Sequence, residues 1–180
     1  MKKIAALVLC LVLMGSLFAG CQQKPKEIPP YFPHSDSIRL DVSEQDIIDL
    51  GIPSTNVITG SYSPPIPVSI EDISFKLVYM AFSSEEDSPV TGHYMNTDNE
   101  LDVPAAYKQL VKHFDTIYGK GRKAENTSDW KTDFVGTEWD FSIDTGEEYR
   151  LNLDYFHLES DEKDNAPYHL SIFVARSDIM

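Results

Sequence analysis

The chain has 180 residues, with 29 acidic against 15 basic residues and a formal net charge of −14. A surface this acidic argues against nucleic acid as a partner and against a direct electrostatic grip on anionic lipid. The length, together with 42% hydrophobic and 11% aromatic residues, fits one globular domain with an ample core.

The N-terminus has the three parts of an export signal. Lys2 and Lys3 form a positive start, and residues 4–13 are an unbroken apolar run that is too short to span a bilayer. Two small residues, Ala19 and Gly20, then lead directly into a cysteine. This order of charge, apolar run and small residues predicts cleavage close to residue 20.

Residues 1–21 resemble the type II signal peptide and lipobox of bacterial lipoproteins, with Phe18 where leucine is common. The resemblance implies a signal peptide over 1–20 and a lipid chain on Cys21. Two or more acyl chains would hold the protein stably at the cell membrane, facing away from the cytoplasm. Gln22 in place of aspartate favours the outer membrane if the host is Gram-negative. The alternative is an ordinary secreted protein with Cys21 as a thiol.

A proline-rich tether and one domain are expected after the signal. Four prolines interrupt residues 21–36, which favours an extended, semi-rigid linker, and residues 37–180 then form a single domain. Cys10 leaves with the signal, so this domain has no disulfide and depends on its core for stability.

One short helix and three strands are predicted in the first half of the domain. Ser43 with Asp46 three residues later resembles a capping box for a helix over 43–50. Apolar and polar side chains alternate best along residues 73–82, which predicts a strand there. Residues 57–62 and 92–97 show the pattern in part and are predicted as two further strands.

The clearest element is a helix over residues 103–118. Asp102 is its expected N-cap, Pro104 lies in the first turn, and Gly119 follows its end. Apolar residues recur along it at helical spacing and form one stripe. This stripe predicts that the helix packs on one face of a sheet.

Three consecutive strands over 137–143, 148–158 and 168–175 predict an antiparallel meander. With the helix, they predict an α+β fold: a small two-layer domain with an antiparallel sheet of about four to five strands and one main amphipathic helix packed on one face. The expected core contains Phe75, Leu110, Phe114, Trp139, Phe141, Leu151, Leu153 and Ile172.

Two patterns resemble catalytic or metal sites. Asp144-Thr145-Gly146 matches the Asp-Thr-Gly triplet of aspartic proteases, but such a site needs a second aspartate that shares a proton, and a plain hairpin turn explains the triplet better. His157 and His169 lie on consecutive expected strands near Glu159, without a zinc-binding motif. We therefore predict no catalytic residue, metal or cofactor.

Trp130 is the candidate binding residue. It lies in an irregular connection, where it either packs over the helix end or stands exposed as an anchor for a partner. Burial statistics for large aromatic residues favour packing.

These patterns predict a non-enzymatic, membrane-anchored envelope lipoprotein whose acidic domain binds a protein, peptide or cell-wall partner. Two alternatives stay open: a small hydrolase that uses Asp144, and a solute-binding accessory lipoprotein. A domain of this size suits one lobe better than the two-lobed cleft usual in solute-binding proteins.

Overall fold

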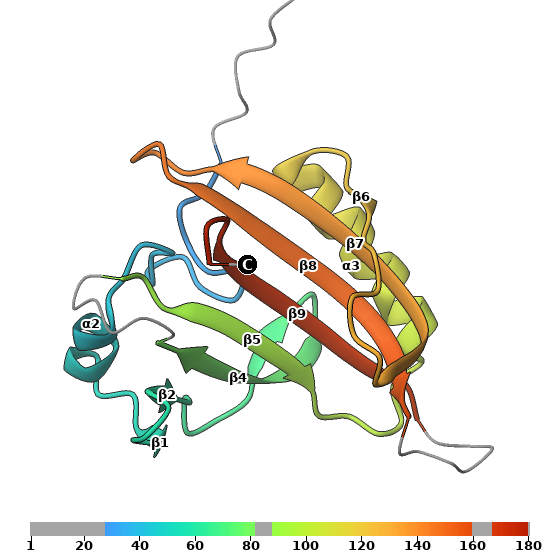
Figure 1. Ribbon diagram of the computed structural model, residues 1–180, viewed down its shortest axis with the longest axis horizontal. Coiled ribbons are helices and arrows are strands. Elements are labelled where there is room, and N and C mark those ends of the chain that lie inside the picture. Colours follow the sequence, from blue (N-terminus) through green and yellow to red (C-terminus); the bar gives the residue numbers. More distant parts are fainter. Residues whose placement is uncertain (1–27, 82–87, 160–166, 180) are drawn as a thin grey trace, which may run out of the picture.

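The computed structural model describes residues 28–81, 88–159 and 167–179, so Cys21 and the expected signal peptide lie outside the described residues. Within them, nine strands form one antiparallel sheet in the order β1-β2-β4-β5-β9-β8-β7-β6, and β3 pairs with β4 off this path (Figure 1). The strands are β1 (Ser54–Asn56), β2 (Ser61–Tyr62), β3 (Val68–Ile70), β4 (Ile73–Met80), β5 (Thr91–Asn96), β6 (Arg122–Lys123), β7 (Lys131–Ser142), β8 (Glu148–Leu158) and β9 (His169–Arg176).

The predicted α+β fold with about four to five strands is wrong. The sheet has nine strands, and the described residues contain just two helices, α2 (Glu44–Asp49) and α3 (Val103–Tyr118), so the fold is largely β. The strands that were missed, β1, β3 and β6, have two or three residues each, too few to show an alternating pattern. Of the strand predicted over 57–62, only Ser61–Tyr62 is a strand, β2, and residues 57–60 form a turn.

Most of the longer elements agree with their patterns, but β7 begins at Lys131, six residues before the strand predicted over 137–143. α3 has the expected bounds, and Asp102 accepts a hydrogen bond from the backbone N–H of Ala105 at 3.1 Å as its N-cap. α2 begins at the expected capping box of Ser43 and Asp46. The meander is confirmed, since β7 pairs with β8 and β8 with β9, all antiparallel.

The core lies against one face of the sheet, where α3 covers one part and the N-terminal segment and α2 add Phe32, Leu40 and Ile47. α3 packs against β7, β8 and β9, and its buried residues include Leu110 and Phe114. All eight side chains expected in the core are buried. The described core draws on residues from 32 to 174 only, with partly buried residues from Ile28 added to it. A chain that starts at residue 21 therefore keeps this whole core.

The described end of the expected tether packs on the domain. Phe32 is 1% exposed, and its ring meets Tyr79 edge-on at 5.1 Å. The ring of His34 lies between two tyrosine hydroxyls, with Nδ1 2.8 Å from Tyr94 and Nε2 3.1 Å from Tyr79. Gly92 makes room for this segment, because a Cβ there would lie 2.8 Å from the Phe32 ring. The sheet therefore holds the chain firmly from about residue 31.

Burial of His34 makes the stability of the fold depend on pH. Desolvation lowers the pKa of His34 from 6.5 to about 4. The contribution of neutral, buried His34 to the free energy of unfolding is fully present above pH 6.5. As the pH falls towards 4, the unfolded chain binds a proton that the folded chain does not, and this contribution is lost. We expect a loss of up to about 3 kcal/mol in unfolding free energy across this window.

Urea unfolding across this pH window tests the role of His34. His34→Gln keeps a donor and an acceptor for the tyrosines but does not titrate, so its stability should vary less with pH. Some dependence should remain, because burial also lowers the pKa of His93. An unchanged pH dependence in His34→Gln would assign the effect to other groups.

Candidate functional site

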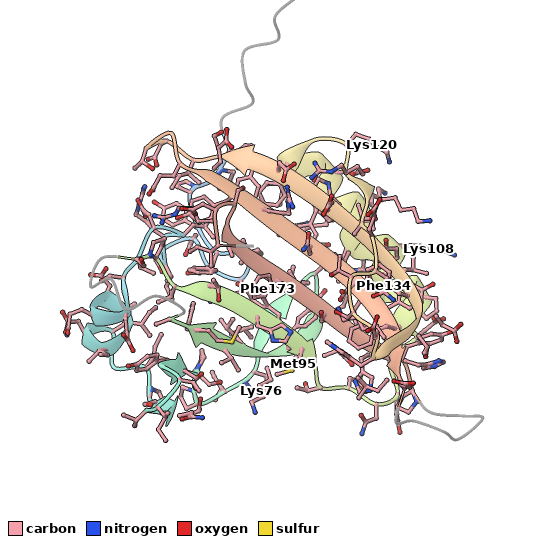
Figure 2. All side chains as sticks on the ribbon, in the orientation of Figure 1. Lys76, Met95, Lys108, Lys120, Phe134 and Phe173 are labelled. Carbon is pink, nitrogen blue, oxygen red and sulfur yellow. The ribbon has the colours of Figure 1, made fainter. Side chains whose placement is uncertain are left out.

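The second face of the sheet points away from α3, and neither described helix lies over it (Figure 1). We call it the open face. Figure 2 shows Lys76, Met95, Phe134 and Phe173 on this side, while Lys108 and Lys120 belong to the α3 side. Side chains alternate along β9, with Ile172 and Val174 in the core, so Ser171 and Phe173 face outward here.

Strand register builds a row of neighbours across the open face. Lys76 of β4 lies opposite Met95 of β5, Met95 opposite Ser171 of β9, and Ser171 opposite Asp154 of β8. The row continues to Gly136 of β7, which is paired with Asp154. Ser171 and Asp154 meet because directly opposed side chains in an antiparallel pair are close neighbours.

A β-bulge brings Lys131 to this row. Lys131 pairs with Leu158 and Gly136 with Asp154, and the register of β7 shifts between Thr132 and Val135. Leu158 and Asp154 lie on the same face of β8, so Lys131 and Gly136 also share a face despite their odd separation. One extra residue in the bulge allows this, and Asp133 within it has a φ of 50°.

Lys131, Asp154 and Ser171 form a half-enclosed polar group, the Lys131 cluster. Lys131 Nζ lies 2.6 Å from Asp154 Oδ2, and Ser171 Oγ donates to Asp154 Oδ1 at 2.6 Å. The side chains of Lys131 and Asp154 are 15% and 11% exposed. This enclosure keeps the ion pair poorly screened and holds both groups in one geometry.

Three aromatic rings surround the Lys131 ammonium group. Its Nζ lies 4.3 Å from the ring centroid of Phe156, 5.2 Å from Trp130 and 5.5 Å from Phe134, within cation–π range. Gly136 lets Phe134 lie over the sheet, because a Cβ there would be 2.6 Å from the Phe134 ring. The rings and the ion pair position one another.

Two hollows adjoin the Lys131 cluster, and Lys131 lines both of them. The first, the Trp130 cleft, has a volume of about 500 Å³. Its walls are mainly apolar and include Met95, Trp130, Phe156, Leu158 and Tyr168, with polar groups from Lys76, His93, Asn96 and His169. The second has about 450 Å³ and more polar walls, including Glu138, Arg150 and Asn152.

Trp130 lies in the wall of this cleft and is half-exposed, so the prediction that it packs away was wrong. Its side chain is 51% exposed, and its ring meets that of Phe156 in a T-shaped contact, at 5.6 Å and 80°. The backbone beside it is held in place, since Trp130 O accepts from the N–H of Glu159 at 2.9 Å and Lys131 O accepts from Asn126 at 2.9 Å. A large apolar surface is thus presented on a fixed support.

Asp144 lies away from both hollows, in the turn between β7 and β8. Arg39 donates to both its carboxylate oxygens, at 3.2 and 2.7 Å, and these bonds lower the pKa of Asp144. The same guanidinium group holds Asp41 at 2.8 and 3.0 Å. Gly146 has a φ of 88°, as the turn interpretation requires. Through its ion pair with Arg39, Asp144 therefore links the β7–β8 hairpin to the N-terminal segment.

The two histidines considered as metal ligands have aromatic partners. The ring of His157 stacks on Tyr168 at 3.9 Å, and that of His169 stacks on Phe156 at 5.7 Å. Across residues 28–81, 88–159 and 167–179, no three His, Cys, Asp or Glu side chains gather as a metal site would require.

In comparisons with known proteins, no family model, curated protein or solved structure matches this chain. Neither helix in the described part of the chain has the length and hydropathy needed to cross a membrane.

Sequence reasoning found Trp130 but missed Lys131, Asp154 and Ser171. One signal was present: β8 alternates with apolar residues on its core face, yet Phe156 and Leu158 on the other face are apolar too. Apolar residues on an otherwise polar strand face indicate a second contact surface.

The Lys131 cluster predicts a stability difference between single and double variants. Lys131→Met leaves the Asp154 carboxylate enclosed with Ser171 alone, and we expect a loss of about 3 kcal/mol in unfolding free energy. Lys131→Met with Asp154→Leu removes both charges and should recover most of that loss. Urea denaturation measures both; a single variant within about 0.5 kcal/mol of the unchanged protein would show that the pair is effectively solvated.

Proposed function

We propose that this chain is a lipid-anchored, non-catalytic binding protein of the bacterial envelope, and that the Trp130 cleft receives its partner. The anchor rests on the residues that lead into Cys21. The binding role rests on one observation: a half-exposed tryptophan on a fixed backbone, in the wall of a cleft of about 500 Å³. Exposed tryptophans in such settings are frequent energetic centres of binding surfaces.

The chemistry of the cleft favours a partner that presents an apolar group within a polar chain. Its aromatic and aliphatic walls suit an apolar side chain or the flat face of a sugar ring. His93, Asn96 and His169 on the walls offer hydrogen bonds beside that group. A peptide segment or wall component therefore fits better than an extended flat protein surface.

The solute-binding alternative has one observation in its favour. A volume of about 500 Å³ lies within the range of small-molecule sites. The hydrolase alternative has none of this kind, because Asp144 lines neither hollow and is bound to Arg39. A thermal-shift screen with small solutes separates the first alternative from a macromolecular partner.

Cell fractionation tests the anchor. In Cys21→Ser the acyl chains have no thiol to attach to, so the protein should leave the membrane pellet and lose the mass of its lipid. Mass spectrometry of the unchanged protein should show that added mass. A Cys21→Ser protein that stays in the pellet with the mass of the unchanged protein would contradict the lipoprotein assignment.

Retention on isolated cell envelopes tests the cleft, with the chain from residue 21 carrying Cys21→Ser. Trp130→Ala should weaken retention at least about tenfold, as for a binding hot spot. The fold should persist, because the side chain is 51% exposed. Val135→Ala is the matched control, an exposed apolar residue that lines neither hollow. Equal retention of the two variants would place the binding surface elsewhere.

A further inference from the structure

The two hollows on the open face adjoin each other. We call the second one the polar hollow, and Lys131 lines both it and the Trp130 cleft. Ser171 of the cleft donates to Asp154 of the polar hollow at 2.6 Å, so the two linings touch. A ligand that extends across Lys131 therefore contacts both hollows.

Strand register builds one wall of the polar hollow. Glu138 of β7 lies opposite Asn152 of β8, and Asp140 lies opposite Arg150 in the next pair on the same face. Arg122 of β6 donates to Glu138 at 2.7 Å and also to Asp140. Arg150 donates to Asp140 through Nε at 2.6 Å. This wall is therefore a ladder of ion pairs across three strands.

The charges that line the two hollows nearly cancel, although the chain as a whole has a net charge of −14. The linings contain three basic and four acidic residues: Lys76, Lys131, Arg150, Asp98, Glu125, Glu138 and Asp154. Ion pairs engage the lysine and the arginine of the polar hollow and two of its three acidic residues. A ligand with a net charge of either sign therefore gains little electrostatic attraction from this lining.

The same ion-paired groups are well suited to hydroxyl groups. A guanidinium group has five N–H donors and a carboxylate about four acceptor positions, so one ion pair does not exhaust either. The lining of the polar hollow adds amide and hydroxyl groups from Asn126, Thr127, Ser128 and Asn152. Because a hydroxyl group both donates and accepts, neighbouring hydroxyls match such adjacent donors and acceptors.

The position of the hollows within the sheet argues against a peptide that binds as an added strand. β8 lies between β7 and β9, and β9 lies between β8 and β5. Their backbone groups therefore serve the sheet, and strand addition requires a free sheet edge. A ligand on this face is recognised by side chains.

We propose that a neutral oligosaccharide occupies both hollows, with the apolar face of one sugar ring on Trp130 and the hydroxyl groups of a neighbouring sugar at Arg150. The proposal rests on the proposed function of the Trp130 cleft and names the class of its ligand. Trp130 supplies the apolar platform and the polar hollow supplies the hydrogen bonds.

Competition for isolated cell envelopes tests the ligand class, with the chain from residue 21 carrying Cys21→Ser. The probe is a soluble envelope fraction that detergent and proteinase K have freed of lipid and protein. In excess, it should lower retention of the chain on intact envelopes at least about tenfold by mass action. Anhydrous hydrogen fluoride cleaves glycosidic bonds and spares peptide bonds, so treating the fraction should abolish its competition.

Salt dependence tests the neutrality of the ligand. Raising the salt concentration from about 0.05 to 0.5 M should change retention less than about twofold, because a neutral ligand has no charge to screen. A stronger dependence would show a charged partner and overturn the proposal.

Variants of Arg150 test the polar hollow. Arg150→Leu should weaken retention at least about tenfold, and the fold should persist because exposed ion pairs contribute little to stability. Arg150→Lys keeps the charge but loses the planar fork, so it should weaken retention too. Arg176→Leu is the matched control, since Arg176 also has an ion-pair partner, Asp178 at 2.7 Å, but lines neither hollow. Equal retention of the two leucine variants would remove the polar hollow from the site and overturn the proposal.

The competition assay separates this proposal from the proposed function. A fraction that still competes after hydrogen fluoride, or that fails to compete after proteinase K, would assign the cleft to a peptide or protein and overturn the oligosaccharide. The Trp130 cleft would then remain the site if Trp130→Ala still weakens retention. Equal retention of Trp130→Ala and Val135→Ala is the separate result that contradicts the proposed function.

Discussion

The bulge in β7 is the constraint on which the open face depends. Without the extra residue between Thr132 and Val135, the alternation that places Trp139 in the core would also turn Lys131 towards the core. With it, the ammonium group meets Asp154 at 2.6 Å on the opposite face. Because a register slip of one residue moves a side chain to the other face of a sheet, the bulge decides whether the Lys131 cluster exists.

From this cluster the properties of the open face follow. The rings of Phe134 and Phe156 lie over the sheet as cation–π partners of the Lys131 ammonium group. Trp130 contacts Phe156 and stays half-exposed beside them. Lys131 lines both hollows, while Ser171 lines the first and Asp154 the second. The protein thus has an apolar core on one side of its sheet and an aromatic, hydrogen-bonding surface on the other.

Long periodic segments could be predicted from the sequence, and features that depend on register could not. α3 and β8 span 16 and 11 residues, and their bounds agree with their apolar periodicity. β2 and β6 have two residues each and exist only because a neighbouring strand offers hydrogen bonds. The Lys131 cluster depends on pairing between β7, β8 and β9 across a bulge, which no local pattern encodes. Trp130 was recognised from its residue type and its place in an irregular connection, and its exposure follows from that pairing.

The most direct test of the account is site-specific photo-cross-linking in cells that make the intact lipid-anchored chain. Benzoylphenylalanine replaces Met95, which is 36% exposed in the wall of the Trp130 cleft, or Lys108, which is exposed on α3 on the other side of the sheet. The account predicts a discrete cross-linked product from position 95 and none from position 108. A product from position 108 with none from position 95 would contradict it and place the binding surface on the helix side of the sheet.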